Sequence, residues 1–219
     1  MPALLFGSIG AVVDTSEMQR DAYNRAFEQH GLDWSWERAD YVEMLRESGG
    51  RDRVAAYASE RGDDVDAEAV HRTKSEIFRT SMADGGLSAR PGVVDAVKRA
   101  RADGHSVALV TTTSPDNVSA MLSALGSEIS ESDFDFVLDT SDVDQPKPDP
   151  EAYRVAISRL ALDASRCVAV EDNVGGVRSA VDAGLTCVAF PNANTAEHDF
   201  DGARSTVDRL DYDQLSELL

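Results

Sequence analysis

Three short segments of the sequence carry side chains that together suit a site for a phosphate ester and a divalent cation. Residues 111–114 (Thr-Thr-Thr-Ser) supply hydroxyl and backbone N–H groups just before a proline, as at the anion-binding N-terminus of a helix. Lys147 stands between two prolines, which stiffen the backbone that carries its ammonium group. Glu171 and Asp172 are adjacent carboxylates, and carboxylate oxygens are ligands that Mg²⁺ prefers.

Each segment also has a more ordinary interpretation. Hydroxyls and carboxylates at such positions could cap helices, and most lysines are solvated. Lysine is scarce here, however, because only Lys74, Lys98 and Lys147 among the 21 basic residues are lysines. This scarcity, and the order of the three segments along the chain, favour a phosphate site over three unrelated ordinary roles.

The elements that must position these residues are short apolar runs typical of buried parallel strands, at residues 3–6, 107–110, 136–138, 167–170 and 186–190. Amphipathic helices are predicted between them, at residues 93–102, 115–125, 150–160 and 174–183. Strands that alternate with helices in this way predict a parallel sheet covered on both faces. Ligands of such sheets bind outside the carboxyl ends of the strands, so we expect the three segments to meet there.

The region after the first strand has a different pattern. From Ser16 to about Met82 the apolar residues recur with helical spacing, and glycines at 31, 49–50 and 62 divide the region into about four helices. The sequence therefore predicts an α/β fold, a Rossmann-like doubly wound parallel core of residues 1–15 and 85–219. An all-helical cap domain of residues 16–84 is inserted after its first strand.

Composition bounds the partners and the environment. The 219 residues include 40 acidic and 21 basic ones, for a net charge of −19 and a pI near 4.4, which argues against nucleic-acid and anionic-membrane partners. Many carboxylates with few lysines suit a halophilic protein. Cys167 and Cys187 lie in apolar runs and are predicted to be buried and reduced. Without a signal-peptide pattern or a long apolar run, we expect a cytoplasmic protein.

On these motifs the chain resembles the haloacid dehalogenase-like (HAD) superfamily, in the branch of β-phosphoglucomutase and phosphoglycolate phosphatase. The matching segments are residues 90–93 (Arg-Pro-Gly-Val), 107–117, 146–150 (Pro-Lys-Pro-Asp-Pro) and 171–176 (Glu-Asp-Asn-Val-Gly-Gly). The resemblance spans nearly the whole chain and implies the Rossmann-like core with its inserted cap. It also implies that Thr111, Thr112 and Lys147 bind phosphate.

The first motif of the family is broken in this chain. The resemblance implies an aspartate nucleophile at residue 7 and an acid/base aspartate at residue 9, where this sequence has Gly7 and Ile9. Without the nucleophile there is no covalent intermediate, and loss of the general acid alone lowers the rate by about 10²–10⁴. The resemblance implies that Asp172, Glu171 and the backbone carbonyl of Ile9 would hold Mg²⁺. The affinity should be lower than in the family, because residue 7 has no carboxylate.

Few other residues offer a substitute. Ser8 lies between the two replaced positions, but strand alternation predicts that its side chain points away from theirs. Asp14 is interpreted as a structural residue of the loop into the cap. Arg51 and Arg53 of the cap could contact a distal anionic group of a substrate. The four histidines are dispersed and predicted to lie at the surface or to be satisfied by ordinary contacts, at positions 30, 71, 105 and 198.

Three functions remain open from the sequence. The first is a HAD-like protein that binds a small phosphorylated metabolite or phosphate and is catalytically impaired or inactive. The second is an active phosphatase of the same fold that uses a non-standard nucleophile or an activated water. The third is a structural partner in an oligomer, although the sequence gives no oligomeric state.

Overall fold

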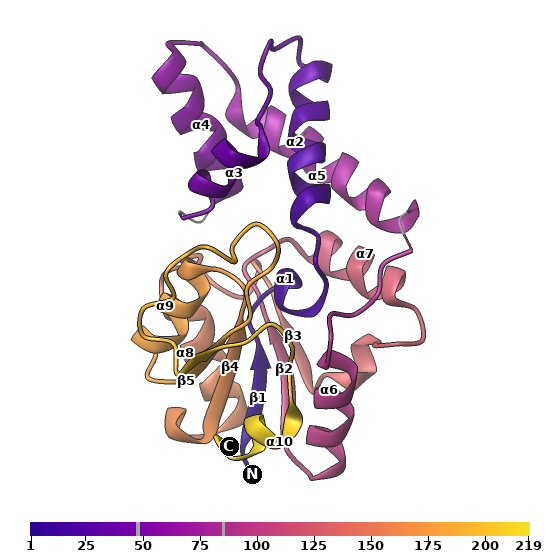
Figure 1. Ribbon diagram of the computed structural model, residues 1–219, viewed down its shortest axis with the longest axis vertical. Coiled ribbons are helices and arrows are strands. Elements are labelled where there is room, and N and C mark those ends of the chain that lie inside the picture. The colour runs from indigo at the N-terminus through magenta and orange to yellow at the C-terminus, as the bar shows by residue number, and fades with distance from the viewer. Residues whose placement is uncertain (47–48, 85) are drawn as a thin grey trace.

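A parallel sheet forms the centre of the computed structural model, which describes residues 1–46, 49–84 and 86–219 (Figure 1). Within these ranges six strands pair in the order β3-β2-β1-β4-β5-β6. Their bounds are β1 (Ala3–Phe6), β2 (Ser106–Val110), β3 (Phe136–Leu138), β4 (Cys167–Glu171), β5 (Thr186–Ala189) and β6 (Ser205–Thr206). Leu4 lies opposite Val107 on one side and Val168 on the other. The doubly wound sheet is confirmed; β6 was not predicted, because its two exposed polar residues form no apolar run.

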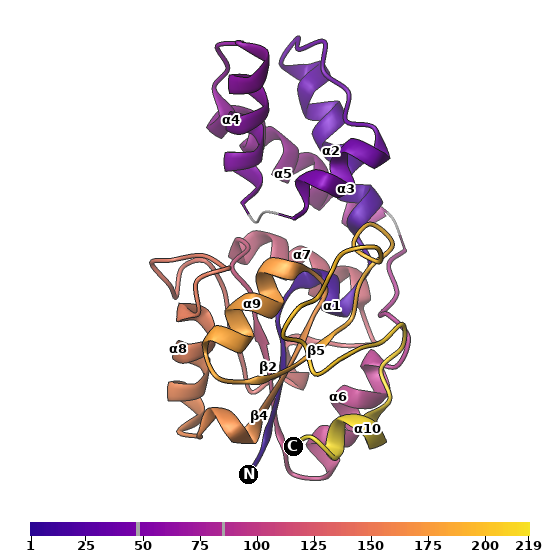
Figure 2. The same cartoon turned by 60° about the vertical axis from the view of Figure 1, so that its left-hand side comes forward.

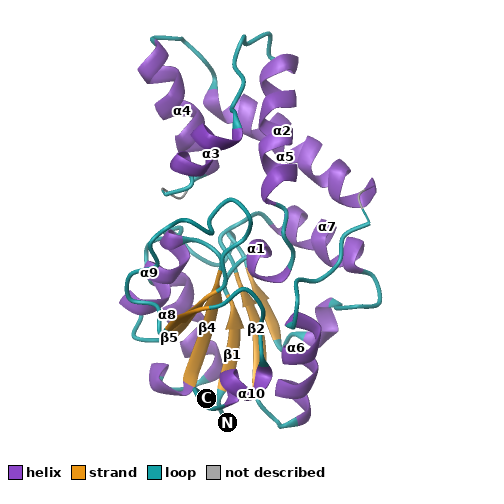
Figure 3. Cartoon of the chain, in the orientation of Figure 1, coloured by secondary structure: helices purple, strands orange, loops and turns teal. Residues whose placement is uncertain are grey.

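Helices cover both faces of this sheet (Figure 3). One face packs against α6 (Val93–Ala102), α7 (Pro115–Leu125) and α10 (Tyr212–Ser216), and the other against α8 (Glu151–Leu160) and α9 (Val174–Asp182). Two short 3₁₀ turns, η1 (Glu131–Asp133) and η2 (Ala164–Arg166), precede β3 and β4. Alternate strand residues enter separate apolar clusters, which is why the strands are apolar throughout. Cys167 and Cys187 are free, buried thiols in the second cluster.

The cap is a helical body beyond the carboxyl ends of the strands (Figure 2). It contains α2 (Ser16–Gln29), α3 (Arg38–Met44), α4 (Gly50–Arg61) and α5 (Ala67–Asp84), which confirms the helical cap. Aromatic rings fill its interior, with Trp36 4.7 Å from both Tyr23 and Phe27 between ring centroids. Gly62 ends α4 with φ of +72°, a conformation that favours glycine.

A four-residue helix that the sequence did not predict, α1 (Ile9–Val12), directly follows β1. Ser8 caps this helix, with its hydroxyl accepting a hydrogen bond from the Ala11 N–H at 2.9 Å. The chain therefore leaves the sheet after Phe6, and residues 7 and 8 form the corner between strand and helix. In the described ranges, no helix combines the length and apolar character that crossing a bilayer requires.

Candidate functional site

A cavity of about 860 Å³ lies between the carboxyl ends of the strands and the cap. Seven of the residues predicted for the site line it: Gly7, Ile9, Thr111, Thr112, Lys147, Asp172 and the cap residue Arg53. Two predicted residues lie elsewhere. Glu171 is fully buried beneath the cavity floor, and Arg51 is exposed beside Asp52, whose carboxylate it contacts at 2.7 Å.

Residues 111–114, the hydroxyl loop, join the end of β2 to α7. The Thr111 N–H donates to the Leu138 carbonyl at 2.9 Å, and the Thr111 hydroxyl accepts from the Thr113 N–H at 3.2 Å. Ser114 is the N-cap of α7, accepting from the Asn117 N–H at 3.4 Å. Capping and cavity lining are thus combined in one loop, which turns the positive end of α7 toward the cavity.

The ammonium group of Lys147 contacts the residue that follows β1 and the last residues of β2 and β4. Its Nζ donates to the carbonyl oxygens of Gly7 at 2.5 Å and Val110 at 2.7 Å and to Glu171 Oε1 at 2.6 Å. The exposed fraction of the side chain is 7%. Since three protons meet three acceptors, Lys147 contributes positive charge to the cavity floor and fixes its shape.

Glu171 occupies the space that a side chain at residue 7 would need. Its Oε1 also accepts from the Tyr153 hydroxyl at 2.7 Å, and a Cβ added to Gly7 would lie 2.1 Å from that oxygen. A Cβ on Gly176 would lie equally close to Oε2. Burial raises the pKa of Glu171, against the opposing effect of Lys147. Two glycines therefore make room for one buried carboxyl group.

The carboxylate of Asp172 accepts three hydrogen bonds from neutral donors. Its Oδ1 accepts from the Ser8 hydroxyl at 2.7 Å and from Asn173 Nδ2 at 2.9 Å, and Oδ2 accepts from Asn192 Nδ2 at 2.8 Å. A Cβ on Gly10 would lie 1.9 Å from Oδ2, so the carboxylate also packs on the α1 backbone. The exposed fraction of Asp172 is 6%.

The residues expected to hold Mg²⁺ do not fit a metal site. Residue 7 has no carboxylate, Glu171 is engaged by a lysine and a tyrosine below the floor, and the oxygens of Asp172 face hydrogen-bond donors. The Ile9 carbonyl accepts the Val13 N–H at 2.8 Å within α1. Throughout residues 1–46, 49–84 and 86–219, no group of three or more His, Cys, Asp or Glu side chains could hold a metal ion.

The cap contributes cations to the opposite wall of the cavity. Lys74 of α5 is only 4% exposed; its Nζ donates to Gln19 Oε1 at 2.9 Å and lies 4.8 Å from the ring centroid of Tyr23. Burial, together with the charge of Arg53, lowers the pKa of Lys74 to about 7. Burial lowers the pKa of the neighbouring His71 to about 4, so its imidazole is neutral at pH 7.

Lys74 was missed in the sequence, although two signals point to it. It is one of three lysines, and its spacing from Val70, Ile77 and Phe78 places it on the buried face of α5. Arg79, one and a half turns further along, also lines the cavity and approaches Asn117 Oδ1 at 3.4 Å.

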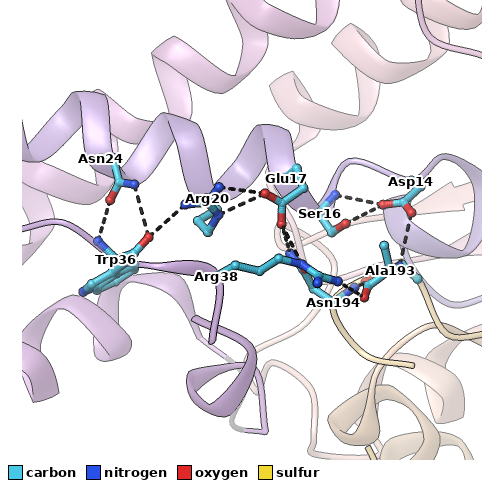
Figure 4. Close-up of polar contacts among 10 residues, drawn as sticks. Asp14, Ser16, Glu17, Arg20, Asn24, Trp36, Arg38, Ala193 and Asn194 are labelled. Atoms are coloured by element: carbon cyan, nitrogen blue, oxygen red, sulfur yellow. Dashed lines mark hydrogen bonds and ion pairs between the residues drawn. The ribbon is translucent and has the colours of Figure 1, made fainter. Parts of the chain in front are cut away.

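A loop of residues 191–198, the clasp loop, joins the cap to Asp172. Figure 4 shows Arg38 of α3 reaching it, with Nε donating to Asn194 Oδ1 at 2.9 Å and Nη2 to the Ala193 carbonyl at 2.6 Å. Asn194 Nδ2 donates to Glu17 of α2 at 2.7 Å. Asp14 accepts from the Ala193 N–H at 3.3 Å, in keeping with a structural role in the loop into the cap.

The same loop contacts the core carboxylate and a second point of the cap. Besides Asn192 on the Asp172 side chain, the Thr195 hydroxyl donates to the Asp172 carbonyl at 2.6 Å. His198 Nε2 lies 3.0 Å from the Val42 carbonyl of α3. His198 therefore links the core to the cap, and His71 lines the cavity. His30 contacts Thr73 within the cap.

Comparisons of this sequence and structure with known proteins all indicate the same family. Residues 3–184 match the model of the haloacid dehalogenase-like hydrolase family. The protein CbbY of Cereibacter sphaeroides is 36% identical over 209 residues, which cover 94% of this chain and 91% of that protein. Crystal structures of CbbY from Rhodobacter sphaeroides are 35% identical and cover 95% of both chains. The structure with phosphate has a TM-score of 0.87, and that of a mutant with xylulose-(1,5)-bisphosphate has 0.88.

Proposed function

Because the chain belongs to the haloacid dehalogenase-like hydrolase family, we propose that it binds a small phosphorylated sugar between core and cap without forming an aspartyl-phosphate. The core is taken as residues 1–15 and 85–219 and the cap as residues 16–84. The ligand site is the cavity between them, where the hydroxyl loop faces the cations of the cap. The phosphate would lie at the end of α7, on the hydroxyls and N–H groups of Thr111 and Thr112. Lys147 would add charge beneath it.

One observation carries the second half of this proposal. The buried carboxyl group of Glu171 fills the space at Gly7, and Lys147 and Tyr153 hold it there. A phosphoryl group that enters the cavity therefore meets a backbone corner at residue 7 in place of a carboxylate. Ile9 brings an apolar side chain where the family uses its acid/base aspartate, so no general acid stands there to protonate a leaving sugar oxygen.

The cap supports a ligand with a second anionic group. Lys74 and Arg53 line the cap side of the cavity and Arg79 lines it beside Asn117 of α7, so one ligand could meet cations at both ends. The CbbY structures, solved with phosphate and with xylulose-(1,5)-bisphosphate, support the same class of ligand. We therefore propose a sugar bisphosphate or a similar doubly anionic sugar phosphate, with Arg53 as the cap contact; Arg51 points to Asp52.

Isothermal titration calorimetry with a ketose bisphosphate and with inorganic phosphate tests binding, and phosphate release tests turnover. We expect binding without Mg²⁺, and no steady-state phosphate release with or without it. Lys74→Met should weaken bisphosphate binding about tenfold or more while leaving inorganic phosphate binding unchanged. Lys98→Met, which removes an exposed lysine on α6, is the matched control and should change neither affinity. Sustained Mg²⁺-dependent release by the unmodified chain, or equal bisphosphate affinity in both variants, would contradict the proposal.

A second candidate function, catalysis through a different nucleophile, is favoured by one contact. The Ser8 hydroxyl lines the cavity and donates to a carboxylate. This contact supports transfer of a phosphoryl group to the protein more directly than hydrolysis.

A further inference from the structure

We propose that Ser8 accepts a phosphoryl group from an acyl phosphate, with Asp172 as the base, and that the resulting phosphoserine is retained. The inference rests on the proposed phosphate site, because the donor's phosphoryl group must lie on the hydroxyl loop next to residue 8. It is independent of the cap cations and of the sugar. Three features of the structure support it: where Ser8 points, how Asp172 is held, and which acids are missing.

The orientation of Ser8 differs from the strand-based prediction. Strand β1 ends at Phe6, and Ser8 begins α1 as its N-cap, so strand alternation does not apply to its side chain. The hydroxyl lies at the cavity wall, with its proton directed to Asp172 Oδ1 at 2.7 Å. One of its two lone pairs accepts the Ala11 N–H at 2.9 Å, which leaves the other for a phosphorus atom.

Asp172 is positioned to receive that proton. Asn173 donates to the same oxygen as Ser8, Oδ1, and Asn192 donates to Oδ2, so the orientation of the carboxylate is fixed at both oxygens. A nucleophile within 2.6–3.2 Å of a base that a third group orients is the geometry shared by activated hydroxyls. Phosphoryl transfer passes through a loose transition state, so the position of the hydroxyl matters as much as removal of its proton, and Asp172 serves both.

Positive charge near Ser8 favours an incoming phosphoryl group. The Lys147 ammonium lies on the carbonyl of Gly7, the residue directly before Ser8, and the N-terminus of α7 opens on the same cavity. The Lys147 ammonium and the positive end of α7 therefore offset the negative charge that the phosphoserine adds beside Asp172.

The class of donor follows from the atoms of the step. The bond between Ser8 Oγ and phosphorus forms, the bond between phosphorus and the acyl oxygen breaks, and the Oγ proton passes to Asp172 and then to solvent. An acyl phosphate releases a carboxylate anion, which needs no proton. A sugar phosphate would release an alkoxide, and the apolar Ile9 supplies no acid for it. Residue 9 also carries no carboxylate to activate a water, which slows hydrolysis of the phosphoserine, so the modification persists.

The test treats the 219-residue chain with acetyl phosphate and measures the phosphoryl mass increment by intact mass spectrometry and by peptide mapping. We expect one phosphoryl group per chain, on Ser8, stable to hydroxylamine as a serine ester is and an acyl phosphate is not. Ser8→Ala should abolish it, and Asp172→Asn should slow it by about 10² or more. Ser75→Ala is the matched control, since Ser75 also lines the cavity but donates to the His71 carbonyl at 2.9 Å.

Calorimetry with inorganic phosphate accompanies every variant, together with circular dichroism to confirm folding. If phosphate binds but no increment forms on Ser8, this inference is overturned while the proposed binding function stands. An increment on another residue, or an unchanged rate in folded Asp172→Asn, would also overturn it. If phosphate does not bind and Ser8 is not labelled, both proposals fail. Labelling of Ser8 without measurable affinity for sugar bisphosphate would support the inference and refute the proposed sugar ligand.

Discussion

The affinity for a doubly anionic ligand should depend on pH through Lys74. Its pKa of about 7 means that the ammonium is charged in about half the molecules at pH 7 and in about 1% at pH 9, so affinity should fall by up to about 50-fold over this range. His71 is already neutral at pH 7, with a pKa of about 4, and the second phosphate ionisation lies near pH 6.

Calorimetric titration of a ketose bisphosphate at several pH values between 7 and 9 measures this dependence. Lys74→Arg keeps the charge at every pH, so its affinity should be nearly flat, and Lys74→Met should bind at all pH values as weakly as the unmodified chain does at pH 9. Inorganic phosphate, which we expect to occupy the hydroxyl loop alone, should show no such decline. A parallel fall of affinity in the unmodified chain and in Lys74→Arg would refute the assignment, as would a flat profile in both.

Three further predictions concern stability and the cap. Gly7→Ala should lower the free energy of unfolding by about 1–3 kcal/mol in urea denaturation, because its Cβ would lie 2.1 Å from the held carboxyl of Glu171. Lys147→Met should cost about 3–5 kcal/mol at pH 8, because it leaves Glu171 buried without its cation, and less at pH 5. Since burial already raises the folded-state pKa of Glu171, acid neutralises the group and restores stability. Arg38→Ala should change stability by less than about 1 kcal/mol but speed limited proteolysis of the cap, whereas Arg46→Ala, which loses only a contact to Glu43, should not.

Each of these has a clear contrary result. A Gly7→Ala variant as stable as the unmodified chain would mean that the carboxyl of Glu171 moves easily. If the loss of unfolding free energy in Lys147→Met became larger toward acid pH, the assigned role of the ion pair would be wrong. Equal proteolysis rates in Arg38→Ala and Arg46→Ala would mean that the clasp loop does not hold the cap.

The order of strands and helices could be predicted because it depends on local patterns. Apolar runs such as residues 167–170 have one stable location, between two helical layers, and glycines such as Gly62 end helices by backbone conformation alone. The meeting of Thr111, Lys147 and Asp172 followed from the same logic, since parallel strands end at one edge.

The direction of individual side chains could not be predicted in this way. Glu171 and Asp172 are adjacent on the chain and point to opposite faces. The Glu171 side chain fills the space beside Gly7 and Gly176, and the Asp172 side chain points toward Ser8. Ser8 itself turns because a short helix begins there, and nothing in its apolar neighbours signals the change of backbone. Helical spacing places Lys74 on the buried face of α5, but its position against the ring of Tyr23 depends on packing within the cap that periodicity does not describe.

The buried carboxyl beside residue 7 also limits which side chains that position accepts. An aspartate placed there would enter a volume already filled by the Glu171 carboxyl and by the Tyr153 hydroxyl that donates to it. A single Gly7→Asp substitution would therefore displace the carboxyl that Lys147 holds, and with it the floor of the cavity. An aspartate at residue 7 needs a second, compensating substitution at Glu171, so the two positions can change only together.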